Sequence, residues 1–71
     1  MKGYTIMEAI KNGVLKTGDI LEVHILAARR TLLGTYHNPI PTLDIEDNSR
    51  YPLNGGDLVV RINGIVYNKV L

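Results

Sequence analysis

The sequence predicts an α+β fold: a short N-terminal helix packed on a small antiparallel sheet of four or five strands, curled into a half-open SH3-like barrel. Three observations favour this class. A helix-start pattern lies near the N-terminus, several β-favouring runs follow at short intervals, and the chain closes with two such runs joined by Asn-Gly. A flat antiparallel sheet with the helix across one face is the alternative that this pattern leaves open.

The length of 71 residues predicts one small globular domain, residues 1–71. A chain of this size buries roughly 60% of its unfolded surface on folding, so its core is small and association with another chain would add stability. The absence of cysteine excludes a disulfide and a thiolate metal site. No apolar run approaches the roughly 20 residues that span a bilayer, and no signal-peptide pattern is present. We therefore expect a cytoplasmic protein with no membrane association.

The helix is predicted from its two end signals. Thr5-Ile6-Met7-Glu8 has the form of a capping box, in which the threonine hydroxyl and the glutamate carboxylate each accept from the other residue's amide. Asn12-Gly13 supplies the C-terminal stop. The apolar residues between these signals are Ile6, Met7, Ala9 and Ile10. Because two helical turns are not stable alone in water, this apolar stripe is predicted to dock on the sheet.

Three further runs have strand character. Residues 20–26 follow a Gly-Asp turn and alternate apolar with polar residues, as a half-buried strand does. Residues 31–36 favour β structure, although the sequence does not decide whether residues 27–37 are strand or part helix. Residues 42–46 form a third, short strand after the prolines at 39 and 41. Residues 47–56 are predicted to be a long polar turn.

The C-terminal hairpin is the strongest local signal, because both residues of an Asn63-Gly64 turn tolerate the positive φ that such a turn needs. Pairing Ile62 with Ile65 fixes the register. The predicted core face then carries Leu58, Val60, Ile62, Ile65, Tyr67 and Lys69, and the other face carries Val59, Arg61, Val66, Asn68 and Val70. So short a chain has few elements to cover both faces. Val59, Val66 and Val70 are therefore predicted to form an interface, in a homodimer or with a partner.

No residue pattern indicates catalysis, and we expect the protein not to be an enzyme. Ser49 has acidic neighbours, but a catalytic triad is recognised by its geometry, and a turn role explains this serine. His24 and His37 lie on different predicted strands, with no third ligand at a metal-binding spacing. Gly55-Gly56 does not precede a helix, as a phosphate-binding loop would. Neither a metal nor a cofactor is expected.

Residues 18–23 and 59–71 resemble the strands of LexA-type autopeptidases. In that family a Gly-Asp turn opens one strand and a hairpin strand carries the lysine base, a place that Lys69 takes here. The family's nucleophilic serine lies just upstream of that turn, whereas residues 8–11 contain none, and Ser49 is the chain's one serine. The resemblance therefore implies a similar β architecture and a catalytically inactive or minimal peptidase fold.

The candidate binding residues lie in predicted connections and strand ends: Arg29, Arg30, Tyr36, His37, Arg50 and Tyr51. Arginine and tyrosine are enriched at the energetic centres of protein interfaces. The formal net charge of +1 gives no general attraction for nucleic acid. We therefore expect an accessory or regulatory protein that binds another protein, in a format typical of phage or mobile-element modulators. A nucleic-acid-binding small β-barrel module is the alternative, and the sequence does not identify the partner.

Overall fold

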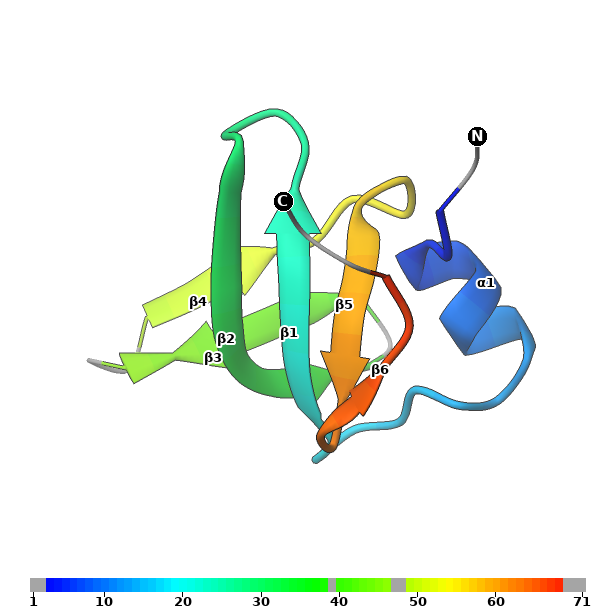
Figure 1. Ribbon diagram of the computed structural model, residues 1–71. Helices are drawn as coiled ribbons and strands as arrows, with labels where there is room; N and C mark the ends of the chain where they lie inside the picture. Colours follow the sequence, from blue (N-terminus) through cyan, green and yellow to red (C-terminus); the bar gives the residue numbers. More distant parts are fainter. Residues whose placement is uncertain (1–2, 39, 47–48, 69–71) are drawn as a thin grey trace.

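The computed structural model describes residues 3–38, 40–46 and 49–68. The elements found in these residues are α1 (Ile6–Lys11), β1 (Ile20–Ile25), β2 (Arg30–His37), β3 (Thr42–Ile45), β4 (Ser49–Pro52), β5 (Leu58–Ile62) and β6 (Ile65–Val66). The six strands form one antiparallel sheet in the order β4-β3-β2-β1-β5-β6 (Figure 1). The α+β class is confirmed. The sheet is open and has more strands than predicted, and the SH3-like barrel stays a prediction.

A strong bend in β2 gives the sheet its shape. Residues 30–35 of β2 pair with β1, whereas residues 35–37 pair with β3. The β3–β4 hairpin consequently crosses behind β1 and β5 (Figure 1). Gly34 lies at this bend, where a Cβ atom would stand 2.3 Å from the Asp44 carbonyl oxygen. Only glycine lets the two strands approach this closely.

The core lies between the two parts of the folded sheet, with α1 beside β5 (Figure 1). Its buried residues come from α1, β1, β2, β3, β5 and the segment after the helix: Ile6, Ala9, Leu15, Leu21, Val23, Ile25, Tyr36, Leu43, Val59 and Ile62. In β1 the buried and less buried residues alternate, as the sequence predicts. Residues 27–37 form a turn followed by β2, which settles that segment as strand.

The predicted capping box at the start of α1 is confirmed. The Glu8 amide donates to Thr5 Oγ1 at 3.3 Å, and the Thr5 amide donates to Glu8 Oε1 at 3.1 Å. The Ile6 amide donates to the Asp57 carbonyl at 3.0 Å, which joins the helix start to the loop before β5. The first amides of α1 therefore have acceptors although the helix is only six residues long.

Replacing Thr5 by alanine is expected to lower the free energy of unfolding by about 0.5 to 2 kcal/mol. The substitution removes the acceptor of the Glu8 amide and frees the Glu8 carboxylate from its partner hydroxyl. Urea unfolding followed by circular dichroism measures the change. An unfolding curve identical to that of the native protein would contradict the role assigned to the cap.

The predicted C-terminal hairpin is also confirmed. Ile62 pairs with Ile65, and Asn63 and Gly64 have φ angles of 50° and 87°, as a type I′ turn requires. The pairing of β5 with β1 contains a β-bulge, because Glu22 pairs with Arg61 while the next residue of β1 pairs with Val59. Val60 is therefore the extra residue in β5.

Because of this bulge, the prediction that Val59 lies on the face opposite the core is wrong. The extra residue shifts the alternation, so Val59 joins Ile62 in the core and is fully buried, which removes it from the predicted interface. Val66 is 53% exposed and pairs with Arg61. Ile65, predicted on the core face, is 63% exposed because β6 is an edge strand. Lys69 and Val70 lie outside the described residues.

The long polar turn predicted for residues 47–56 is also wrong in part, because β4 lies within it. β4 pairs with β3 along its whole length, and it is polar because it is the edge strand of the sheet. Pro52 has no amide hydrogen and Arg50 carries a charge, and both features oppose pairing with a further strand. The composition of an edge strand resembles that of a turn for this reason.

One side chain fastens the two ends of the described chain to β5. Asn68 Oδ1 accepts from the Tyr4 amide at 3.0 Å, and Asn68 Nδ2 donates to the Tyr4 carbonyl at 2.8 Å. The same Nδ2 also donates to the Val59 carbonyl. The Tyr4 and Tyr67 rings are stacked with centroids 5.1 Å apart. Asn68 thus supplies a side-chain amide where a further strand would supply a backbone amide.

Candidate binding surfaces

The six residues predicted to bind a partner lie in separate places. Arg29 and Arg30 are exposed where β1 turns into β2, and His37 ends β2 beside Arg50 of β4. Tyr51 is half-buried and packs against the core. They do not form one continuous surface.

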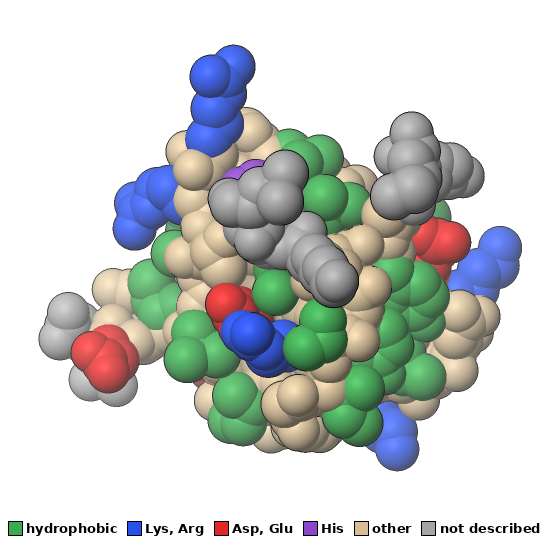
Figure 2. All heavy atoms as spheres, in the orientation of Figure 1, with side chains coloured by type: hydrophobic (Ala, Val, Ile, Leu, Met, Phe, Trp, Pro, Cys, Tyr) green, Lys and Arg blue, Asp and Glu red, His purple; other side chains and the backbone are tan. Residues whose placement is uncertain are grey.

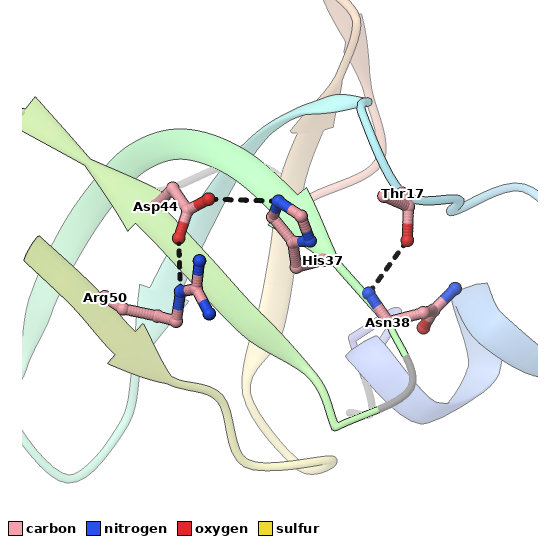
Figure 3. A network of polar contacts seen from close by, with 5 residues as sticks. All are labelled: Thr17, His37, Asn38, Asp44 and Arg50. Carbon is pink, nitrogen blue, oxygen red and sulfur yellow. Dashed lines mark hydrogen bonds and ion pairs between the residues drawn. The ribbon is translucent and has the colours of Figure 1, made fainter. Parts of the chain in front are cut away.

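The prediction of Tyr36 as a surface residue is wrong. Its side chain is fully buried, as is that of Leu43, its partner on β3. Alternation along β2 directs Tyr36 inward and its neighbour His37 outward. The Tyr36 hydroxyl donates to Asn38 Oδ1 at 2.6 Å. Figure 3 shows the next bond, in which the Asn38 amide donates to Thr17 Oγ1 at 2.9 Å. Burial raises the pKa of the Tyr36 phenol above its ordinary value of 10.0.

This raised pKa predicts a loss of stability in alkali. The folded protein binds the phenol proton more tightly than the unfolded chain does, so the stabilisation is complete below the ordinary pKa and is lost as the pH rises through the raised one. We expect the free energy of unfolding to fall more steeply with pH for the native protein than for Tyr36→Phe. Urea unfolding at about pH 8 and about pH 11 measures both slopes. Equal slopes would contradict the assignment.

Asp44 joins His37 to Arg50 across three neighbouring strands (Figure 3). Its Oδ2 atom lies 3.1 Å from His37 Nε2, and its Oδ1 atom accepts from Arg50 Nε at 2.9 Å. These side chains are in contact with solvent, which screens their charges and limits their effect on stability. Arg50, which the sequence predicts to bind a partner, is therefore already paired with the Asp44 carboxylate. Within residues 3–38, 40–46 and 49–68, no group of three His, Cys, Asp or Glu side chains is placed to hold a metal ion.

A different surface lies along α1. Ile6 and Ala9 are buried in the core, whereas Met7 is 64% exposed and Ile10 is 37% exposed. An open groove of about 510 Å³ runs beside these two side chains. We call it the α1 groove, and its lining residues are Met7, Ile10, Lys11, Pro41, Leu53 and Gly55. Figure 2 shows hydrophobic side chains gathered over α1 at the right of the molecule.

Backbone hydrogen bonds hold the walls of the α1 groove together. The Met7 amide donates to the Gly55 carbonyl at 3.1 Å, which joins α1 to the loop between β4 and β5. The Leu53 amide donates to the Pro41 carbonyl at 2.8 Å, which joins that loop to the segment before β3. The buried carboxylate of Asp57 accepts from two backbone amides and fixes the same loop. The groove is therefore part of the fold and does not need a partner to form.

The prediction that all four apolar residues of α1 dock on the sheet is wrong for Met7 and Ile10. Neighbouring residues in a helix point about 100° apart, so adjacent apolar residues cannot all face one sheet. Four apolar residues among six helical positions exceed one buried stripe. That excess is the sequence signal for a second apolar face.

No protein-family model, curated protein sequence or solved structure matches this chain. The described part of the chain has no helix long and apolar enough to cross a membrane. Ser49 is exposed at the start of β4. Lys69 is not among the described residues, so the resemblance to LexA-type autopeptidases stays a prediction.

Proposed function

We propose that this protein is a non-enzymatic accessory or regulatory protein that binds an apolar segment of another protein in the α1 groove. The observation that carries the proposal is the exposure of Met7 and Ile10 beside Pro41 and Leu53. Contiguous exposed apolar side chains mark interaction sites, and burying one large apolar side chain stabilises a complex by about 1.5 to 3 kcal/mol. Methionine fits irregular partner surfaces because its side chain is flexible and polarisable.

The charges around the α1 groove favour an acidic partner segment. Lys11 lines the groove, and within the described residues its ammonium group has no ion-pair partner. The nearby Glu8 carboxylate is held by the Thr5 amide and hydroxyl. An apolar segment that carries an aspartate or glutamate would therefore meet both the apolar walls and the free cation. Such a segment can enter as an amphipathic helix, which places its apolar side chains on one face.

Nucleic-acid binding is the second candidate, and the ion pairs weaken it. Arg50 is paired with Asp44, and Arg61 is paired with Glu22. Arg29 and Arg30 are exposed, but they stand together at a single turn. Tracking a nucleic-acid backbone requires a basic groove with aromatic stacking surfaces, and the Tyr36 ring is buried.

We accordingly expect no binding of single-stranded oligonucleotides at physiological salt. Fluorescence anisotropy with labelled oligonucleotides measures it, and a true phosphate contact would give a log-log salt slope of roughly −0.7 per phosphate neutralised. Sub-micromolar, salt-sensitive binding that Arg29→Ala and Arg30→Ala abolish would favour the nucleic-acid function over the α1 groove.

Selection of a random displayed-peptide library on the immobilised protein tests the proposed function. The expected result is enrichment of peptides that combine apolar residues with an acidic one and that lose binding to Met7→Gln. Leu33→Gln is the matched control, because Leu33 is 62% exposed and lies on β2, outside the α1 groove. Peptides that bind Met7→Gln as tightly as the native protein would overturn the proposal.

A further inference from the structure

A second apolar surface covers the outward face of β1, β2, β5 and β6. Leu33 pairs with Glu22, Glu22 pairs with Arg61, and Arg61 pairs with Val66. Directly paired residues point to the same side of a sheet, so these four side chains form one row across four strands. Leu33 is 62% and Val66 is 53% exposed, and Ile20, two residues from Glu22, is 49% exposed. Figure 2 shows this face, with hydrophobic side chains around an acidic and a basic side chain near its centre.

The order of chemical types along this row is symmetric in an unusual way. Leu33 and Val66 are the two apolar ends, and the ion pair of Glu22 with Arg61 lies between them. Read from the opposite end, the row is again apolar, charged, charged, apolar, with the two signs exchanged. A reversed copy is therefore complementary to the original in both charge and apolarity. An interface between identical chains requires this kind of self-complementarity.

We propose that two copies of this chain associate face to face through this row. The two-fold axis lies between the two sheets and runs parallel to the strands, between β1 and β5. Leu33 of each copy then covers Val66 of the other, and Glu22 of each copy faces Arg61 of the other. An axis across the strands would instead oppose Glu22 to Glu22 and Arg61 to Arg61, an arrangement that like charges destabilise.

The size of the face sets the strength of the dimer. The paired parts of β1 and β2 have six residues each, β5 has five and β6 has two. With about 3.3 Å per residue and strands about 4.8 Å apart, they cover on the order of 300 Å² in each copy. This area is below that of stable specific interfaces, so the dimer is weak, with a dissociation constant on the order of 100 μM to 1 mM. The polar side chains of His24 and Thr31, which hydrogen-bond at 3.2 Å, lie beside the row as part of a polar rim. The dimer is independent of the α1 groove, which stays free in this arrangement.

An isotope-filtered nuclear Overhauser experiment on a mixture of labelled and unlabelled protein tests the proposal directly. The expected result is an intermolecular cross-peak between the methyl groups of Leu33 and Val66. Within one chain these residues are three strands apart, about 14 Å, which is too far for a cross-peak. A dimer without this cross-peak, or a protein that stays monomeric up to about 1 mM, would overturn the proposal.

Sedimentation equilibrium on variants separates the dimer from the proposed function. Leu33→Lys places a cation beside Glu22 in its own chain but opposite an apolar side chain of the other copy, so it is expected to weaken the dimer at least about tenfold. Met7→Gln is the control with equal exposure outside this face, and it should leave the dimer unchanged. Glu22→Lys should also weaken the dimer, and Glu22→Lys with Arg61→Glu should restore it. A dimer that Met7→Gln weakens and Leu33→Lys does not would show a different interface and refute this one.

Discussion

Gly34→Ala is expected to remove a large share of the protein's stability. The new Cβ would stand 2.3 Å from the Asp44 carbonyl oxygen and 3.0 Å from Leu43 Cγ, and the first of these is a backbone atom that no side-chain rotation can move. The β2–β3 pairing would have to open at the bend that folds the sheet over its core. We expect a loss of about 3 kcal/mol or more, against a total stability of about 4 to 10 kcal/mol for a domain of this size.

Gly56→Ala is the matched control for this prediction. A Cβ at Gly56 has no atom within 4 Å, and the backbone there does not have a positive φ. The free energy of unfolding should therefore change by less than about 0.5 kcal/mol. Urea unfolding of both variants measures the same Gly→Ala substitution at two positions, one where the added Cβ meets the β3 backbone and one where it meets no atom. Two variants of equal stability would mean that β2 does not approach β3 as described.

Asn68→Asp is expected to have the second largest effect, because it keeps the shape of the side chain and removes its donors. Asn68 Nδ2 faces the Tyr4 and Val59 carbonyl oxygens, and a carboxylate oxygen in its place would repel both. A buried polar group without its partner costs about 1 to 3 kcal/mol. The Tyr4 carbonyl also accepts from the Val59 amide at 2.9 Å, so the Tyr4 carbonyl keeps one donor. The expected loss is about 1 to 3 kcal/mol, with a weaker attachment of Tyr4 to β5.

Asn12→Asp provides the control for Asn68→Asp. Asn12 Nδ2 donates to the Tyr4 hydroxyl at 2.9 Å in an exposed position. The hydroxyl can rotate and donate to a carboxylate instead, so the loss should stay below about 1 kcal/mol. Thermal unfolding measures both changes, and amide hydrogen exchange at Val59 reports whether the N-terminal segment has left β5. Slow exchange at Val59 in Asn68→Asp would contradict the role of this side chain.

The parts of the fold that were predicted correctly depend on neighbours in sequence. The capping box at Thr5 and Glu8 and the turn at Asn63-Gly64 are both complete within four residues, so their chemistry is visible in the chain. The parts that were missed depend on distant strands. The bulge at Val60 exists because of how β5 meets β1, and no residue near Val60 marks it. β4 was missed because its edge position makes its composition polar.

The candidate surfaces are harder to predict, because moving one residue along a strand changes the side of the sheet to which the side chain points. Tyr36 and His37 lie next to each other at the end of β2, and each side chain has a polar group and a ring. Only the pairing of β2 with β3 decides which of the two side chains is buried. The row from Leu33 to Val66 joins four strands and depends on the pairing of β1 with both β2 and β5. The excess of apolar residues in α1 was the one surface signal present locally.

The most direct test of the proposed protein-binding function is a chemical-shift titration. Amide spectra of the ¹⁵N-labelled protein are recorded as a library-selected apolar and acidic peptide is added. The account predicts the largest shifts in residues that line the α1 groove, including Met7, Lys11 and Gly55, with small shifts along β1. Shifts that concentrate on the outward face of β1 and β2, and leave Met7 and Gly55 unchanged, would contradict it.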